Sequence, residues 1–152
     1  MKNKRQNLNS GFVALFTVLI ASIILAMAVG IANISLKQIV LSGSATDANK
    51  SFYVADSGVE CALYNDIRVH AFDIDLPASS ISCGGTSVNL DPQVQVGLWS
   101  FSLDFNDSGP ACAKVTVDKT DPDIKKIISK GTNAQCDVPT SRTVERVIEV
   151  TY

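Results

Sequence analysis

An uncharged run from Phe12 to Ala32 constrains this chain more than any other feature of its sequence. The run contains no proline and no amide side chain, and only Thr17, Ser22 and Gly30 interrupt its apolar residues. At 1.5 Å per residue, a helix of this length is about 30 Å long, which matches the hydrocarbon core of a bilayer. The sequence therefore predicts a membrane-spanning helix over residues 12–32.

Charge is distributed unequally on the two sides of this run. The charged residues before it are all basic (Lys2, Lys4 and Arg5), whereas the part after residue 33 holds ten basic and fifteen acidic residues. Basic residues flanking a span stay preferentially in the cytoplasm. We therefore expect a single-pass protein of the inner, or cytoplasmic, membrane, with its amino terminus in the cytoplasm and the remainder outside. An acidic outer part repels phosphate, so nucleic acid is not expected as the main ligand.

Three fates are open for the apolar run. Ala26-Met27-Ala28 matches the small-x-small pattern at which a secretory signal peptide is cut. However, the run is longer than the usual apolar region of a signal peptide and continues past this position, which favours a retained anchor. A retained anchor is either uncut or trimmed at Gly11, the glycine that precedes the run.

A second helical pattern follows the membrane run. Apolar or small residues recur at spacings of four and three, at Leu41, Ala45, Ala48, Phe52, Ala55, Val59 and Ala62. This stripe predicts an amphipathic continuation of the helix over residues 33–70, with a bend or loosening near Gly43. Its expected role is to cover a sheet, while small residues also let other helices approach the membrane half closely.

Residues 71–152 have the pattern of an antiparallel sheet. Apolar and polar residues alternate in the segments 94–105, 111–119 and 142–152, and turn residues separate them. The segment 124–133 is expected to return as a hairpin partner after the turn at Thr120 to Asp123. About four strands with one apolar face need a cover, which the amphipathic helix supplies. The predicted fold is α+β, with a long amino-terminal helix packed on a small antiparallel sheet.

Four cysteines all follow the membrane run: Cys61, Cys83, Cys112 and Cys136. An even number of cysteines in a small exported domain favours disulfides, and four cysteines can pair in three ways. We favour Cys112 with Cys136, which flank the predicted hairpin, and Cys61 with Cys83, which would tie the helix end to the first loop. No CxxC spacing accompanies the lone His70, so no metal site is expected.

Enzyme chemistry finds little support in the sequence. A Cys61–His70 pair with Asp73 imitates a nucleophile and base, but nine helical residues place the first two on opposite faces. Nucleotide-binding, serine hydrolase and zinc protease motifs are missing. Asp73 with Asp75, and Asp121 with Asp123, are interpreted as solvated turn residues rather than calcium ligands. We expect neither an enzyme nor a cofactor.

The sequence "SGFVALFTVLIASIILAMAVGIANISLKQ" resembles the class III leader and first helix of the type IV pilin and pseudopilin family. The later segment "FYVADSGVECALY", Phe52 to Tyr64, resembles a stretch common in PilX-like minor pilins. Together these segments lie within about the first 65 residues, and the sheet region is similar to the family only in its general layout.

The resemblance implies a processing site and a set of partners. A prepilin peptidase would cut between Gly11 and Phe12, discard the leader 1–11 and methylate the new amino terminus. Partners would be other pilin-like subunits, membrane lipid and an inner-membrane assembly platform with a separate ATPase, and the assembled filament would lie at the cell surface. Residues of the assembly helix would include Phe12, Phe16, Leu19, Ile23 and Gly30.

Phe16 departs from the family pattern. Most members have a glutamate at the fifth mature position, where it is thought to pair with the amino terminus of a neighbouring subunit. A carboxylate inside a bilayer is costly unless it is paired, so Phe16 removes both that cost and an assembly contact. This favours a minor subunit of a pilus or secretion-type filament over an abundant one. The alternative is a membrane-anchored binding or adhesion module that does not polymerise, with ligand loops at residues 77–90 and 106–110.

Overall fold

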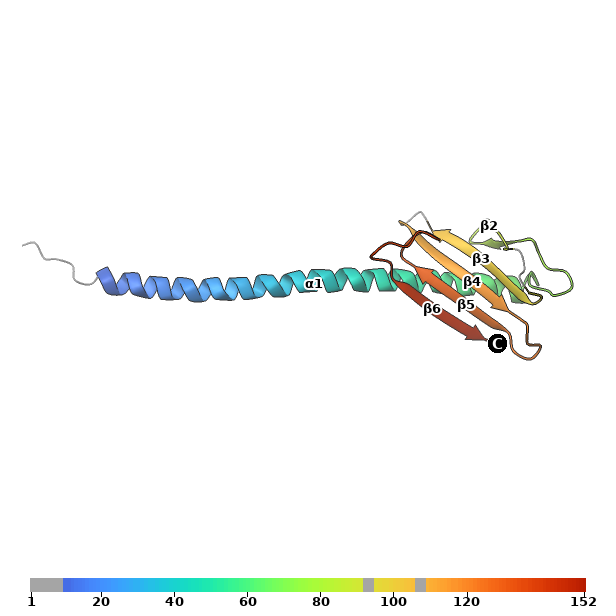
Figure 1. Ribbon diagram of the computed structural model, residues 1–152, viewed down its shortest axis with the longest axis horizontal. Helices are drawn as coiled ribbons and strands as arrows, with labels where there is room; N and C mark the ends of the chain where they lie inside the picture. Colours follow the sequence, from blue (N-terminus) through green and yellow to red (C-terminus); the bar gives the residue numbers. More distant parts are fainter. Residues whose placement is uncertain (1–9, 92–94, 106–108) are drawn as a thin grey trace, which may run out of the picture. The chain divides into compact units, whose positions relative to one another are not determined.

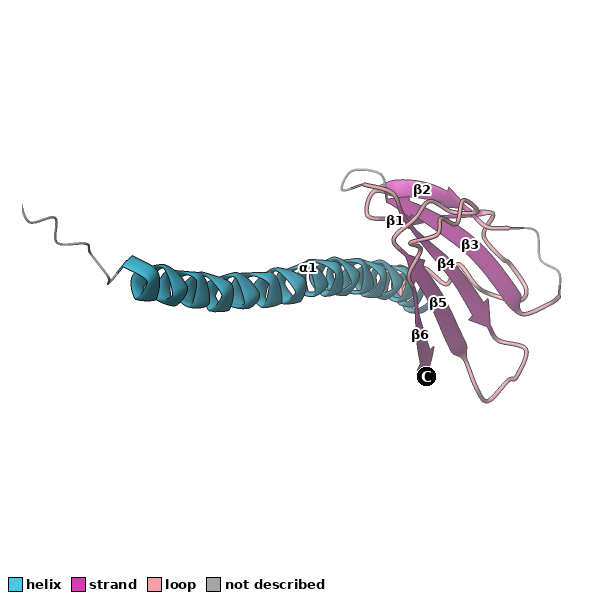
Figure 2. Cartoon of the chain, turned by 60° about the vertical axis from the view of Figure 1, so that its left-hand side comes forward, coloured by secondary structure: helices cyan, strands magenta, loops and turns pink. Residues whose placement is uncertain are grey.

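The computed structural model describes residues 10–91, 95–105 and 109–152. Its element order is α1 (Ser10–Ile67), β1 (Ser80–Cys83), β2 (Thr86–Asn89), β3 (Leu98–Phe105), β4 (Ala111–Asp118), β5 (Lys126–Thr132) and β6 (Glu145–Thr151) (Figures 1 and 2). The chain divides into two compact units, Met1–Gly43 and Ser44–Tyr152. One long amino-terminal helix with antiparallel sheets confirms the predicted α+β class.

The first unit contains the apolar part of α1. The backbone is helical through Gly43, where this unit ends. Two hydroxyl side chains within the apolar run bond back to the helix: Thr17 Oγ1 donates to the carbonyl of Ala14, and Ser22 Oγ to that of Leu19, each at 2.8 Å. Both donors are therefore satisfied without water, as a lipid environment requires.

The second unit is built on a four-stranded antiparallel sheet in the order β3-β4-β5-β6. Alternate residues of β3 are buried, as predicted, among them Trp99, Phe101 and Leu103. Val115 and Val117 of β4 are buried on the same face, because Phe101 pairs with Val115 and Trp99 with Val117. The predicted hairpin is confirmed by the antiparallel pairing of β4 with β5. One face of the sheet therefore forms the core.

Residues 44–67 of α1 cover this apolar face (Figures 1 and 2). Buried helix positions are Ser51, Val54, Ala55, Gly58, Val59, Ala62, Asn65 and Asp66. The predicted stripe is thus confirmed at Ala55, Val59 and Ala62, but Ala45 and Phe52 are exposed. Ser51 is buried against the sheet in place of Phe52, because only small side chains fit where helix and sheet come closest.

The closest approach involves two glycines. A Cβ atom added at Gly131 of β5 would lie 2.9 Å from the Cα of Ala55, with Ser51 also in contact. A Cβ atom added at Gly58 of α1 would lie 2.8 Å from Val115 Cγ2. Helix and sheet therefore meet backbone to backbone, and no side chain separates them at Gly131.

The segment expected as a loop at residues 77–90 contains two strands, so this expectation was wrong. β1 and β2 form an antiparallel hairpin with Cys83 opposite Thr86. Its turn, Gly84–Gly85, has positive φ at both residues, which glycine adopts without strain and which suits a two-residue hairpin. Each strand has only four residues, and of these only Ile81 and Val88 are apolar enough to signal a strand. Such a short alternation does not stand out from loop composition.

The helix ends at Ile67, three residues before the expected boundary at residue 70. His70 has a left-handed backbone with φ of 56°, and the N–H of Ala71 donates to the carbonyl of Asn65. This turn closes the helix and leads the chain back toward the core, where Phe72 is buried. Residues 1–9 of the expected leader and residues 106–108 of the expected second ligand loop lie outside the described residues.

Candidate functional site

An apolar surface surrounds the helix over most of the described part of the first unit. Every residue from Phe12 to Leu41 is exposed within the described chain. Each predicted assembly residue lies on this surface: Phe12 is 77% exposed, Phe16, Leu19 and Ile23 are exposed, and the space beside Gly30 is open. Gly11 belongs to the first turns of α1.

Such a surface needs a cover that the described chain does not supply. At about 25 cal/mol per Å², each exposed leucine, isoleucine or phenylalanine gains roughly 1.5–3 kcal/mol on burial. Monomeric soluble proteins rarely expose contiguous apolar surface on this scale. The helix contains a stretch long and apolar enough to cross a membrane. Lipid and apolar helices are the two partners with matching chemistry.

Two disulfides tie the second unit together. Cys61 pairs with Cys83 and Cys112 with Cys136, with Cα atoms 5.5 and 5.1 Å apart, so the favoured pairing is confirmed. The two cysteines of the first disulfide are 22 positions apart in the sequence, and those of the second are 24 positions apart. Links of this length restrict the unfolded chain and typically stabilise a domain by about 2–4 kcal/mol.

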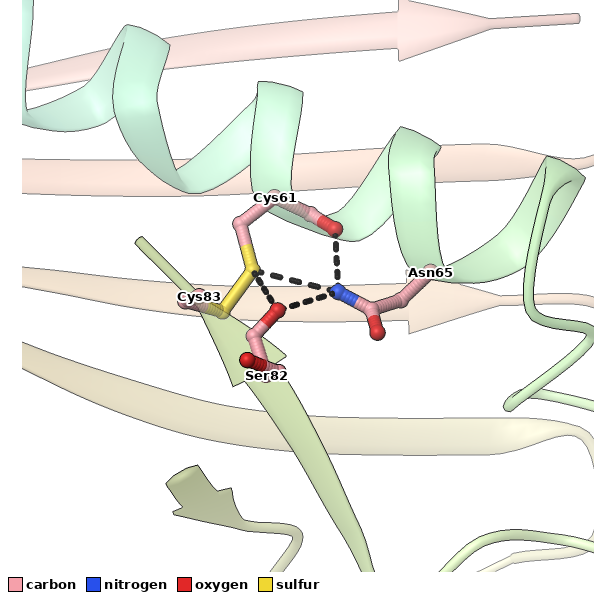
Figure 3. The surroundings of a disulfide bond; sticks show 4 residues. All are labelled: Cys61, Asn65, Ser82 and Cys83. Carbon is pink, nitrogen blue, oxygen red and sulfur yellow. Dashed lines mark hydrogen bonds between the residues drawn. A yellow bond between two sulfur atoms is a disulfide. The ribbon is translucent and has the colours of Figure 1, made fainter. Parts of the chain in front are cut away.

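Asn65 reinforces the link between α1 and the β1–β2 hairpin (Figure 3). Its Nδ2 atom donates to the Cys61 carbonyl at 2.9 Å and to the Ser82 carbonyl at 3.0 Å. Asn65 is buried, and Ser82 is next to Cys83 of the disulfide. The hairpin is therefore attached to the helix by one covalent bond and one hydrogen-bonded side chain.

A buried polar cluster joins the end of α1 to Lys119, the residue after β4, and to Tyr152, the residue after β6. Lys119 Nζ forms an ion pair with one carboxylate oxygen of Asp66 and donates to the Phe72 carbonyl at 2.9 Å. Tyr152 donates its hydroxyl to the other oxygen of Asp66. The Asp66 and Lys119 side chains are only 3% and 13% exposed. Both oxygens of the carboxylate are thus satisfied, which offsets the cost of burying it.

Sequence reasoning missed this cluster. The one available signal was Asp66 itself, which falls four residues after Ala62 and so continues the predicted apolar stripe. A carboxylate on a core-facing stripe indicates a buried partner. Nothing in the sequence identified Lys119 or Tyr152 as that partner, because they lie 53 and 86 residues away.

The Tyr152 hydroxyl gives a testable dependence on pH. Burial, followed by the hydrogen bond to Asp66 and its charge, raises the pKa of Tyr152 above its ordinary value of 10.0. As pH rises, Tyr152 loses its hydroxyl proton in the unfolded chain before it does so in the folded protein. The stability that the hydrogen bond to Asp66 contributes is therefore complete below about pH 10 and is lost as pH rises above that value. We expect Tyr152→Phe to flatten the alkaline fall in unfolding free energy, measured by urea titration between pH 8 and pH 11.

Tyr64→Phe is the matched control, because Tyr64 is an exposed tyrosine of α1. It should leave the alkaline slope of the wild-type protein unchanged. An equal slope in Tyr152→Phe and the wild-type protein would contradict the role of the Asp66 contact.

The candidate catalytic and metal residues have structural roles in the described chain. Cys61 is in a disulfide, so it does not form a thiol pair with His70. Asp104, Cys112 and Cys136 lie close together, but both sulfur atoms belong to the second disulfide and are unsuited as thiolate ligands.

Acidic turn residues accept backbone hydrogen bonds. Asp118 accepts from the Thr120 hydroxyl at 2.7 Å and from its N–H at 3.0 Å, which lowers the pKa of Asp118. Asp121 accepts from the N–H of Asp123 at 2.9 Å. These bonds shape the β4–β5 turn, as expected of turn carboxylates. In the other pair, Asp73 accepts a longer bond, 3.5 Å, from the Asp75 N–H.

Comparisons with known proteins found no matching family model, no matching curated protein and no matching solved structure.

Proposed function

We propose that this chain is a minor pilin-like subunit of a type IV pilus or a related secretion-type filament. The observation that carries the proposal is the exposed apolar surface of α1 from Phe12 to Leu41, followed in the same helix by a segment buried under a disulfide-linked sheet. The apolar part would lie first in the inner membrane and then among the helices of other pilin-like subunits. Both locations would keep the apolar side chains out of water.

Processing would precede assembly. A prepilin peptidase would cut between Gly11 and Phe12 on the cytoplasmic side, so that the leader is lost and the anchor is kept. An assembly platform and its separate ATPase would then extract the subunit from the membrane. The second unit, stabilised by its disulfides, would face the oxidising exterior of the filament.

Intact mass and amino-terminal sequencing of the full chain, produced in cells that contain a prepilin peptidase, test the processing step. We expect the wild-type protein to begin at N-methylated Phe12 and Gly11→Val to remain uncut, because a branched side chain would block the site. Ala28→Val is the control, since it alters the secretory pattern at Ala26-Met27-Ala28 and should leave processing unchanged. A wild-type chain that begins at Met1 would indicate a plain anchored module, and one that begins at Val29 would indicate conventional export.

Phe16 allows a second test, of the minor role. Phe16→Glu should raise the number of copies in purified filaments, because a carboxylate there would offer a partner to the amino group of a neighbouring subunit. Leu19→Glu introduces the same buried charge three residues away without that partner, and should lower the copy number. Quantitative mass spectrometry of filaments measures both. A wild-type copy number comparable to that of the most abundant subunit would contradict the minor role.

A further inference from the structure

A large groove in the second unit separates the β1–β2 hairpin from the edge of the main sheet. Its volume is about 1830 Å³, beyond the roughly 300–1,000 Å³ of typical small-molecule pockets. Residues of α1, β1, β2 and β3 line it, among them Val54, Tyr64, Ser87, Asn89, Ser102 and Asp104. The groove has room for a segment of polypeptide.

The β3 side of the groove is an unpaired strand edge. Gly97 accepts a hydrogen bond from the N–H of Lys119, which places the odd-numbered backbone groups of β3 toward β4 and the even-numbered ones outward. Ser100 fits this pattern, because its carbonyl accepts from the N–H of Asp91 at 2.8 Å. The backbone groups of Ser102 and Asp104 point the same way, and no described residue is bonded to them.

The β2 side is a second unpaired edge. The N–H of Leu90 donates to the Ser79 carbonyl, so Val88 and Thr86 also direct their backbone groups to β1. The intervening residues Ser87 and Asn89 therefore direct theirs away from β1, toward β3. Between the described parts of β2 and β3 no ladder forms, since the two strands belong to different sheets. Two rows of backbone donors and acceptors thus face one groove.

Contacts hold the hairpin to β3 at its base and to α1 at its turn, and some residues of β2 and β3 lie near each other. Asp91 holds the base of the hairpin to Ser100 of β3, through its own N–H and by accepting the Ser100 hydroxyl at 2.9 Å. The turn end is held to α1 instead, by the Cys61–Cys83 disulfide and the Asn65 bond to Ser82 (Figure 3). These links tie the turn end of the hairpin to the helix rather than to β3.

The charges and apolar residues of the groove indicate what would enter it. Among the described residues that line it, three are acidic and one is basic: Glu60, Asp91, Asp104 and Lys50. Asp104 follows the buried Leu103 in β3, so its side chain lies on the sheet face opposite the helix. On the helix side, Val54 and Leu103 offer apolar contact. A strand that entered would present alternate side chains to these two environments.

We propose that this groove binds an extended peptide segment of another protein, with apolar residues alternating with basic ones. The backbone of the segment bonds to Ser102 and Asp104 of β3 and faces Ser87 and Asn89 of β2. Its apolar side chains turn toward α1 and its basic side chains toward Asp104. This is strand addition at a preformed edge, in which main-chain bonds give affinity and alternate side chains give selectivity.

Fluorescence anisotropy with the full chain in detergent micelles tests the proposal. The probe is a labelled peptide, acetyl-Thr-Val-Lys-Val-Lys-Val-Thr-amide, compared with a version in which glutamate replaces lysine and one in which alternate amides are N-methylated. We expect saturable binding of the lysine peptide only. Ser102→Pro removes an outward N–H of β3 and should weaken binding roughly fivefold to tenfold, as for one lost hydrogen bond.

Val147→Pro is the matched control, because it removes an outward N–H from β6, the opposite edge of the same sheet. It should not change the affinity. Equal binding of the N-methylated peptide, or a loss in Val147→Pro but not in Ser102→Pro, would overturn the proposal.

Amide hydrogen exchange of the unmutated protein gives a second readout that does not depend on folding of a variant. Adding the lysine peptide should slow exchange at Ser102 and Asp104 and leave Val147 unchanged. Slow exchange at Ser87 and Ser102 without peptide would mean that the two edges close on each other, and would also overturn the proposal.

Discussion

Gly131→Val should unfold the second unit or destabilise it by about 3 kcal/mol or more. The added Cβ atom would lie 2.9 Å from the Cα of Ala55, and the neighbouring atoms are helix backbone, which cannot rotate out of the way. The helix would have to move off the sheet and lose burial at Ala55 and Val59. Because domains of this size are stable by only about 5–15 kcal/mol, this is a large fraction of the total.

Trp99 reports the result directly. It is the chain's one tryptophan and is 1% exposed in the core of the second unit, so its fluorescence follows unfolding of that unit in urea. Lys130→Val is the control, because Lys130 precedes Gly131 on β5 and its side chain is exposed. This control should change the unfolding free energy by no more than about 0.5 kcal/mol. Gly131→Val with wild-type stability would rule out the close approach of helix and sheet.

Asp66→Ala should cost about 3–5 kcal/mol, because it leaves the Lys119 ammonium buried without its counter-ion. Lys119 would retain the Phe72 carbonyl and a position 5.9 Å from the centre of the Trp99 ring, neither of which carries a full negative charge. The Tyr152 hydroxyl would lose its acceptor in the same substitution. Urea unfolding followed by Trp99 fluorescence measures the loss.

Two variants separate this effect from ordinary surface electrostatics. Glu149→Ala breaks the Lys126–Glu149 ion pair, whose side chains are 35% and 52% exposed, and should cost less than about 1 kcal/mol. Adding Lys119→Met to Asp66→Ala removes the unpaired charge and should recover much of the stability. If the double variant were less stable than Asp66→Ala, the cost would not come from the stranded ammonium.

The sequence predicted those helices and strands whose hydrophobic pattern repeats over many residues. The apolar run beginning at Phe12 and the alternation around Trp99 each extend over enough residues to stand out from chance, and both appear as predicted. The β1–β2 hairpin was not predicted, because four-residue strands of mostly small polar side chains contain only one or two periods of alternation. The amphipathic stripe was partly right: its period was correct, but Phe52 points away from the sheet.

Contacts between distant segments account for the rest. Gly58 and Gly131 look like unfavourable residues in a helix and a strand until the two backbones are brought together. Similarly, Asp66 is an ordinary helix residue until Lys119 and Tyr152 close around it. No short stretch of sequence contains such a contact, because it depends on how the helix crosses the sheet.

By itself, the sequence determined the apolar helix, the α+β class and the presence of four cysteines in the part that follows the apolar run, because periodicity and composition are local properties. The tertiary structure alone decided that Ser51 rather than Phe52 is buried, how the buried carboxylate is neutralised and that β2 and β3 belong to different sheets. These features depend on shape and hydrogen bonding between residues far apart in the chain. The pairing of Cys61 with Cys83 lies between the two cases. The order of the predicted helix end and first loop favoured it, and the disulfide forms because the hairpin lies against α1.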